Sequence, residues 1–212
     1  LEQEAQYLSR ELSGMVGLEL PFIPEKDPEG PAIVLENKPV TVTGNRSESY
    51  ILELQSGLIR IQGSPAGVFY GMQSLLSLIP YEVQEQKSGV ITLPNAYVED
   101  TPRFGYRGQH IDVCRNFQTR DQLLKVIDLM SRYKLNRLHL YLTEDEGWRI
   151  EIKALPELTE VASKRGHPAE STECLPPAYG SGPFPYAPGN HGTGYYTQEE
   201  FTEIIRYAHQ RH

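Results

Sequence analysis

The sequence TPRFGYRGQHIDVCRNFQTRDQLLKVIDLMSRYKLNRLHLYLTEDEGWRIEIKALP, residues 101–156, holds two apolar strand-like runs, GQHIDV and NRLHLYL, on either side of an amphipathic helix. A strand, a helix and a second strand in this order are typical of a parallel β–α–β unit. Charged residues follow each run: Arg115 after the first, and Glu144, Asp145 and Glu146 after the second. Ligands bind at the carboxyl ends of strands in such units, so the sequence predicts the functional site there.

The two strands are predicted over residues 107–113 and 136–142. Thr119 with Gln122 three residues later is a capping box, so the intervening helix is expected to begin there. Its buried stripe, at helical spacing, is predicted to consist of Leu123, Ile127, Met130 and Tyr133.

A long segment rich in Pro, Gly and Tyr, residues 166–194, follows the second strand and is typical of a functional rim or a disordered loop. Thr197 with Glu200 forms a second capping box that begins a last helix. The apolar residues predicted to face one way on this helix are Phe201, Ile204, Ile205 and Ala208.

The first hundred residues predict a separate, smaller unit. Two helices are expected, over residues 1–14 with Gly14 as the C-cap, and from Ser64-Pro65 to Pro80. Strands are predicted over residues 18–23, 32–35, 50–54, 58–62, 90–93 and 96–98, with a hairpin turn at residues 55–57. Two helices on one face of a small, largely antiparallel sheet make an α+β unit that ends near residue 100.

Composition excludes some classes of function. The 212 residues carry 20 Lys+Arg against 28 Asp+Glu, a net charge of −8, which argues against a nucleic-acid partner. No apolar run approaches the ~20 residues of a membrane span, and the chain opens on an amphipathic helix rather than a signal peptide. Cys114 and Cys174 are only two and far apart, so they are expected to be free thiols rather than a disulfide, and their spacing fits no zinc motif.

Three segments, RGQHIDVCRNF, NRLHLYLTEDEGWRIEIKALPELTE and GYYTQEEFTEIIRYAHQRH, resemble the family 20 glycoside hydrolases, the β-N-acetylhexosaminidases. Residues 1–100 resemble the small α+β domain that precedes the catalytic domain in that family. The resemblance implies that residues 101–212 form the first two βα units of an incomplete (β/α)8 TIM-type barrel. A whole barrel needs about 250 residues, so the chain is interpreted as the amino-terminal part of an enzyme.

The resemblance also implies a reaction: hydrolysis of terminal N-acetyl-D-hexosamine residues by a retaining, substrate-assisted mechanism. The 2-acetamido oxygen of the substrate attacks the anomeric carbon, a glutamic acid protonates the leaving oxygen, and an aspartate orients the acetamido group. No metal and no organic cofactor is expected. The catalytic Asp-Glu pair is expected downstream of His212, and the dipeptide Asp145-Glu146 is not interpreted as that pair.

By its place in the family motif, Arg115 is expected to hydrogen-bond the hydroxyls on carbons 3 and 4 of the terminal sugar; the alternative is a structural salt bridge to Asp112. Glu144, where the family usually has aspartate, Asp145 and His139 are expected to form a network that supports the catalytic acid. A solvated loop or a helix cap is the alternative for the two carboxylates. For His139 the favoured alternative is a histidine satisfied within the core.

Aromatic residues give weaker indications. Trp148 is a possible aromatic subsite for a sugar face, although the family context favours packing under the loop. Tyr141 stands where the family has a second histidine, which weakens any role there, and Asn116 stands where it often has histidine. Two interpretations are open for a group of loop aromatics: they form a subsite for the aglycone, or they simply pack within the loop. These residues are Tyr179, Phe184, Tyr186, Tyr195 and Tyr196.

The partners implied are N-acetylglucosamine- or N-acetylgalactosamine-terminated glycans, and a periplasmic or secreted location follows by resemblance. Open sheet edges in an incomplete barrel would also favour self-association. Two other functions stay open. One is a non-catalytic amino-sugar-binding protein, and the other is a different barrel hydrolase with Asp145 or Glu146 as the acid.

Overall fold

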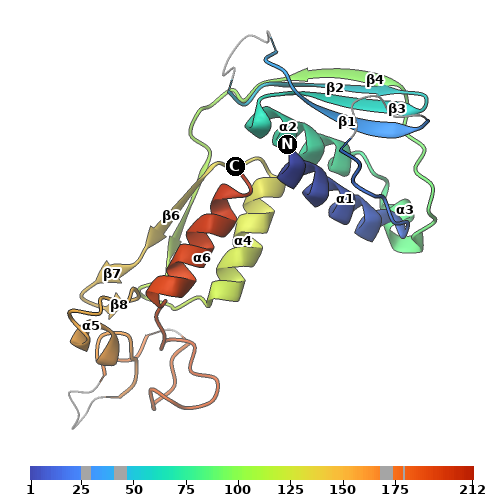
Figure 1. The fold of residues 1–212 in the computed structure, drawn as a ribbon. Helices are drawn as coiled ribbons and strands as arrows, with labels where there is room; N and C mark the ends of the chain where they lie inside the picture. The colour runs from blue at the N-terminus through green and yellow to red at the C-terminus, as the bar shows by residue number, and fades with distance from the viewer. Residues whose placement is uncertain (25–29, 41–46, 168–173, 179) are drawn as a thin grey trace. The chain divides into compact units, whose positions relative to one another are not determined.

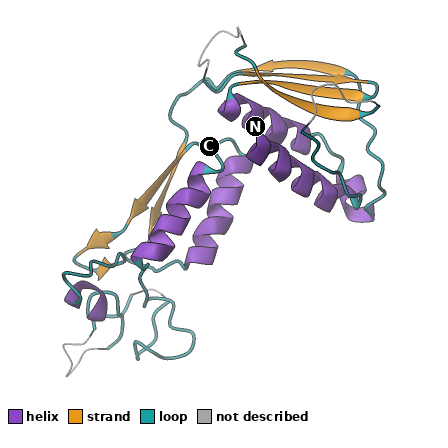
Figure 2. Ribbon diagram, in the orientation of Figure 1, coloured by secondary structure: helices purple, strands orange, loops and turns teal. Residues whose placement is uncertain are grey.

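The computed structural model describes residues 1–24, 30–40, 47–167, 174–178 and 180–212. The chain divides into two compact units, Leu1–Gly105 with His212, and Tyr106–Arg211. Each unit has its own hydrophobic core. Figure 1 traces the helices and strands in chain order, and Figure 2 colours them by type.

The first unit is built on a four-stranded sheet in the order β1-β3-β2-β4. Strands β1 and β3 are parallel, whereas the β3–β2 and β2–β4 pairs are antiparallel, so the predicted, largely antiparallel sheet is confirmed. The β2–β3 hairpin is also confirmed, with Gly57 at φ 78°, a backbone conformation that favours glycine. The strands are β1 (Ala32–Asn37), β2 (Tyr50–Gln55), β3 (Leu58–Gly63) and β4 (Ala96–Asp100).

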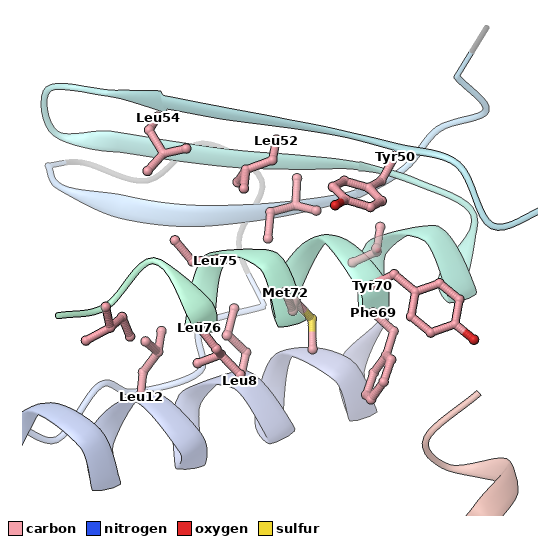
Figure 3. Close-up of a cluster of buried hydrophobic side chains, with 13 residues drawn as sticks. Leu8, Leu12, Tyr50, Leu52, Leu54, Phe69, Tyr70, Met72, Leu75 and Leu76 are labelled. Carbon is pink, nitrogen blue, oxygen red and sulfur yellow. The ribbon is translucent and has the colours of Figure 1, made fainter. Parts of the chain in front are cut away.

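Helices α1 (Glu2–Val16) and α2 (Pro65–Ser77) lie on one face of this sheet (Figure 2). Helix α2 begins as predicted, with Ser64 accepting a hydrogen bond from the backbone N–H of Gly67 and Pro65 in the first turn. Between helices and sheet lies a core in which Leu52, Met72 and their neighbours are fully buried (Figure 3).

Three predictions for this unit were wrong, and one helix was missed. Helix α1 passes Gly14 and ends at Val16, with Gly17 (φ 74°) as its C-cap, because Val16 is still part of the buried stripe. Residues 18–23 form no strand and expose three large apolar side chains, Leu18, Phe22 and Ile23. Residues 90–93 alternate in burial as a strand would, yet they pair with no strand in the described part of the chain. A third helix, α3 (Tyr81–Gln86), was missed because it buries no residue.

The space around Gly67 on α2 and around Gly14 on α1 predicts opposite effects of substitution by alanine. A Cβ at Gly67 would lie 2.1 Å from the backbone oxygen of Ser49, whereas a Cβ at Gly14 would meet nothing within 4 Å. We expect Gly67→Ala to lower the free energy of unfolding by about 1–3 kcal/mol through overpacking. Gly14→Ala should raise it by roughly 0.5–1 kcal/mol, because alanine is the better helix former. Thermal unfolding of the two variants distinguishes them, and shifts of the same sign would contradict the packing described.

The second unit contains the predicted β–α–β unit. Strands β5 (Gly108–Asp112) and β6 (Arg137–Tyr141) are parallel neighbours, connected through α4 (Arg120–Arg132). Helix α6 (Gln198–His209) packs beside α4, and both predicted capping boxes are present. In Figure 2 the two helices cover one face of the strand pair. The buried core of this unit consists of Val113, Leu123, Ile127, Tyr196 and Ile204.

Two residues assigned to the buried stripes are exposed. Tyr133 is 77% exposed because α4 ends at Arg132, so the helical period no longer holds at this C-cap position. Ile205 is 43% exposed because it follows the buried Ile204 and therefore points about 100° away around the helix.

Short elements follow β6 at the carboxyl edge of the strand pair (Figure 1). Strands β7 (Thr143–Glu144) and β8 (Gly147–Trp148) form an antiparallel hairpin, and α5 (Glu157–Glu160) is a single turn. The described residues between α5 and α6 are largely irregular chain, as predicted for the long loop.

Candidate functional site

The turn after β5 fixes Arg115 at the carboxyl edge of the strand pair. The Asp112 carboxylate accepts hydrogen bonds from the backbone N–H groups of Cys114 (3.0 Å) and Arg115 (3.1 Å). Its second oxygen lies 2.5 Å from Nη1 of Arg115. Burial acts to raise the pKa of Asp112, but the hydrogen bonds from Arg115 outweigh it and the pKa is lowered. The alternative interpretation of Arg115, a salt bridge to Asp112, is therefore present in the structure.

Glu144 meets Arg115 from the neighbouring strand end. Its Oε2 lies 2.9 Å from Nη2 of Arg115, although Glu144 belongs to β7 and Arg115 follows β5. The Glu144 side chain is only 8% exposed, and its Oε1 is buried without a hydrogen-bond partner among the described residues. The structure thus brings together the two residues predicted to share a site and leaves one carboxylate oxygen free to accept a hydrogen bond.

Asp145 and Glu146 form the turn between β7 and β8 and are both exposed. Oε2 of Glu146 lies 3.8 Å from Nε of Arg115 and 3.7 Å from Nη2 of Arg165. Both distances exceed hydrogen-bond length, so these are loose ion pairs. The role predicted for Asp145 in a supporting network stays a prediction.

Arg149 is a buried residue of this region that the sequence interpretation missed. Its side chain is 0% exposed and donates to main-chain carbonyls of three separate segments. The acceptors are Val113 (3.0 Å), Cys114 (2.6 Å), Ser163 (2.8 Å), Gly192 (2.9 Å) and Gly194 (2.9 Å). Burial lowers the pKa of Arg149 to about 10. The position of Arg149 between the apolar residues Trp148 and Ile150 was the sequence feature that indicated a buried arginine. Its acceptors are main-chain carbonyls, so no pattern of side chains in the sequence identifies them.

Arg165 was missed for the same reason. Its side chain is 3% exposed, and Nη1 donates to the Pro176 carbonyl at 2.9 Å. Nε and Nη2 have no hydrogen-bond partner in the described part of the chain. The main chain of Arg165 is tied to the following loop through Thr193 Oγ1 (3.0 Å) and Asn190 Nδ2 (2.9 Å). Arg149 thus joins the loop to the end of β5, and Arg165 joins segments of the loop to one another.

His139 lies on the opposite face of β6 from the core. Its neighbours Leu138 and Leu140 pack into the core, so the alternation of strand side chains turns His139 the other way, where it is exposed. Within residues 1–212 His139 is therefore not part of a core. Its ring stands edge-on to that of His110, with centroids 4.6 Å apart. No hydrogen bond between His139 and Glu144 is found among the described residues, and the network role stays a prediction.

The aromatic residues divide into three groups. The indole N–H of Trp148 donates to the Ile150 carbonyl at 2.7 Å, a contact that serves loop packing. Tyr196 is 1% exposed and hydrogen-bonds the Gln118 carbonyl, so of the two interpretations left open the structure shows packing for this residue. Phe184, Tyr186 and Tyr195 are exposed, whereas Tyr179 lies outside the described residues.

Two further expectations concern metals and thiols. Cys114 and Cys174 are buried free thiols, as predicted, and burial raises the pKa of Cys114 to about 12. Within the described ranges, no cluster of three His, Cys, Asp or Glu residues could hold a metal ion. No described helix has the length and apolar character to cross a membrane.

Comparison with protein families gives two matches that together span nearly the whole chain. Residues 1–101 match the model described as "Glycosyl hydrolase family 20, domain 2". Residues 104–212 match "Glycosyl hydrolase family 20, catalytic domain".

Characterised proteins with similar sequences carry matching names. A "Beta-hexosaminidase" of Vibrio vulnificus is 43% identical over 82% of this chain and 20% of its own length. An "N,N'-diacetylchitobiase" of Vibrio harveyi is 40% identical over 82% of the chain and 19% of its own length. A "Beta-hexosaminidase" of Porphyromonas gingivalis is 37% identical over 100% of the chain and 25% of its own length. The chain thus spans about a quarter or less of these relatives.

Solved structures are similar over the same extent. The exo-β-N-acetylglucosaminidase of Vibrio harveyi in complex with N-acetylglucosamine has a TM-score of 0.77 and 30% identity, over 99% of this chain and 29% of that chain. A mutant β-hexosaminidase of Streptomyces plicatus in complex with its product has a TM-score of 0.76 and 31% identity, over 99% and 37%.

Proposed function

Because the chain belongs to glycosyl hydrolase family 20, we propose that the protein containing residues 1–212 removes terminal N-acetyl-β-hexosamine residues from glycans. The observation that carries the proposal is the contact between Arg115 and Glu144 at adjacent strand ends, 2.9 Å between Nη2 and Oε2. Both structural relatives described above hold N-acetylglucosamine, which fits a terminal amino sugar as the ligand.

In this proposal Arg115 binds the vicinal hydroxyls of the terminal sugar. Its guanidinium is planar and always charged, so it can offer two parallel N–H donors to two adjacent oxygens. Asp112 and Glu144 hold the group in one orientation, which lowers the entropy lost when the sugar binds. The side chain remains 56% exposed, so a ligand can reach it.

Glu144 is proposed to orient a second group in the site. Its Oε1 is buried and free to accept a hydrogen bond, and a buried acceptor gains free energy when a donor reaches it. A histidine N–H from another part of the protein would supply such a donor and link Glu144 to the catalytic acid. Asp145 and His139 are proposed as further members of the network that supports the catalytic acid.

Residues 101–212 are proposed to be the first part of a (β/α)8 barrel, preceded by a small α+β domain over residues 1–100. The Asp-Glu pair of a retaining, substrate-assisted mechanism then lies in protein beyond His212. The parallel β5–α4–β6 unit, with charged residues at its carboxyl edge, supports this assignment. An exported location suits an enzyme that acts on glycans.

The test is an assay of the full-length protein on p-nitrophenyl N-acetyl-β-D-glucosaminide. We expect hydrolysis, with the sugar released first as the β-anomer in an NMR time course. The matched substrate p-nitrophenyl β-D-glucoside, which lacks the acetamido nucleophile, should be cleaved at least ~1,000-fold more slowly. Purified residues 1–212 should give no turnover. An α-anomer as the first product, or equal rates on the two substrates, would contradict the proposed mechanism.

A further inference from the structure

The three carboxylates around Arg115 are not equivalent. Asp112 and Glu144 lie within hydrogen-bond distance of the guanidinium, at 2.5 and 2.9 Å, whereas Glu146 lies 3.8 Å away. Glu144 is 8% exposed and Glu146 is 55% exposed. Glu146 is therefore the carboxylate that can move away from Arg115 without breaking a hydrogen bond or leaving a buried position.

The guanidinium of Arg165 offers a second binding position for the Glu146 carboxylate. The same oxygen that faces Arg115 lies 3.7 Å from Nη2 of Arg165. Nε and Nη2 of Arg165 are buried and have no hydrogen-bond partner among the described residues. These two donors share one edge of the guanidinium, and that edge matches both oxygens of a carboxylate. Leaving buried N–H donors of a charged group unpaired costs free energy, so Arg165 favours a closer carboxylate.

The two neighbouring positive charges, Arg149 and Arg165, also favour a carboxylate close to Arg165. Arg149 lies near Arg165, and its pKa is lowered first by burial and then by the positive charge of Arg165. The hydrogen bonds of Arg149 go to main-chain carbonyls rather than to carboxylates. Among the described residues, Glu146 is the carboxylate within ion-pair distance of Arg165.

We propose that Glu146 is a movable carboxylate that controls access to Arg115. It bridges Arg115 and Arg165 in the arrangement described. When sugar hydroxyls hydrogen-bond Arg115, Glu146 shifts and docks on Nε and Nη2 of Arg165. Glu146 and Arg165 are thus positioning residues, and the inference rests on the proposed role of Arg115 as a sugar ligand.

A double-mutant cycle in the full-length protein tests the coupling. In Arg165→Met the receiving group is gone, so Glu146 stays on Arg115 and competes with the sugar. We expect a KM for p-nitrophenyl N-acetyl-β-D-glucosaminide, and a Ki for N-acetylglucosamine, about 10-fold higher, with kcat within about 2-fold. Glu146→Gln alone should not raise KM, because the carboxylate that competes with the sugar for Arg115 is then gone. The double variant should return KM to within about 3-fold of the unmodified protein.

Rescue by the second substitution separates this mechanism from a merely structural role, in which the double variant binds no better than Arg165→Met. That additive result would overturn the proposal. Arg165→Lys, which keeps the buried charge but lacks the two-donor edge, replaces Arg165→Met if the latter fails to fold, and the same rescue by Glu146→Gln is expected. The control for a lost carboxylate is Glu160→Gln on α5, an exposed position that should not rescue.

A structural measurement tests the movement without a sugar. In a crystal structure of the full-length Arg115→Ala variant, Glu146 has lost one of its two cations. Both of its oxygens are then expected within about 3.2 Å of Nε and Nη2 of Arg165. A Glu146 side chain turned to solvent would overturn the docking. Absence of sugar binding by the unmodified protein would instead remove the proposed function, so the two failures are distinguishable.

Discussion

Replacement of Arg115 by alanine in the full-length protein is expected to lower kcat/KM for an N-acetyl-β-glucosaminide by roughly 10²–10⁴-fold. Two hydrogen bonds from a charged donor to the sugar would be lost together. Asp112 and Glu144 would also be left as neighbouring carboxylates without the cation that lies between them. The measurement is steady-state hydrolysis of the aryl glycoside, with thermal unfolding recorded in parallel to show that the variant is folded.

Two comparison variants make this result specific. Arg115→Lys keeps the charge but loses the planar pair of donors, so its kcat/KM should fall between those of the alanine variant and the unmodified protein. Arg120→Ala removes a partly exposed arginine, one paired with Asp121 and Glu203. Its kcat/KM should stay within about 2-fold, because exposed ion pairs contribute little. An Arg115→Ala variant that retained half of the activity would remove the proposed site.

Arg149→Met is expected to lower the free energy of unfolding by about 3–5 kcal/mol, because buried carbonyl oxygens in three segments lose their donor. Those oxygens include Cys114, Ser163 and Gly192, with donor distances of 2.6 to 2.9 Å. Chemical denaturation of the full-length protein measures the change. Limited proteolysis should show faster cleavage within residues 180–194, which Arg149 fastens to the strand ends.

The matched control is Arg206→Met on α6, where the arginine is exposed. It should change the free energy of unfolding by no more than about 0.5 kcal/mol. If the two arginine variants unfolded at the same denaturant concentration and were cleaved at the same rate, the hydrogen bonds of Arg149 would be shown to contribute little.

Local chemistry explains which parts of the fold could be predicted. The capping boxes at Thr119 and Thr197 depend on residues three positions apart, so the sequence alone reveals them. The β5–α4–β6 order follows from apolar periodicity in the same way. The end of α1 could not be predicted, because both Gly14 and Gly17 can cap a helix and the choice depends on burial of Val16 in the tertiary fold.

The candidate site was only partly visible in the sequence. Arg115 and Glu144 were found because they follow strands whose ends are adjacent in a parallel pair. Arg149 and Arg165 were not found, because their acceptors are main-chain carbonyls up to 45 residues away, and any residue type supplies a carbonyl. A long-range contact between a side chain and the main chain leaves no mark on residue spacing.

The acceptors of Arg149 are main-chain carbonyls, and this determines which residues of the loop can be substituted. Arg149 grips the loop at Gly192 and Gly194 through carbonyl oxygens, which every amino acid possesses. The backbone of the loop is therefore held in place whatever side chains the neighbouring loop positions carry. Exposed positions such as Phe184 and Tyr186 can be randomised in a mutant library while the backbone beneath them keeps its anchor. Arg149 thus keeps the backbone of the loop in place while the exposed side chains of the loop are free to change.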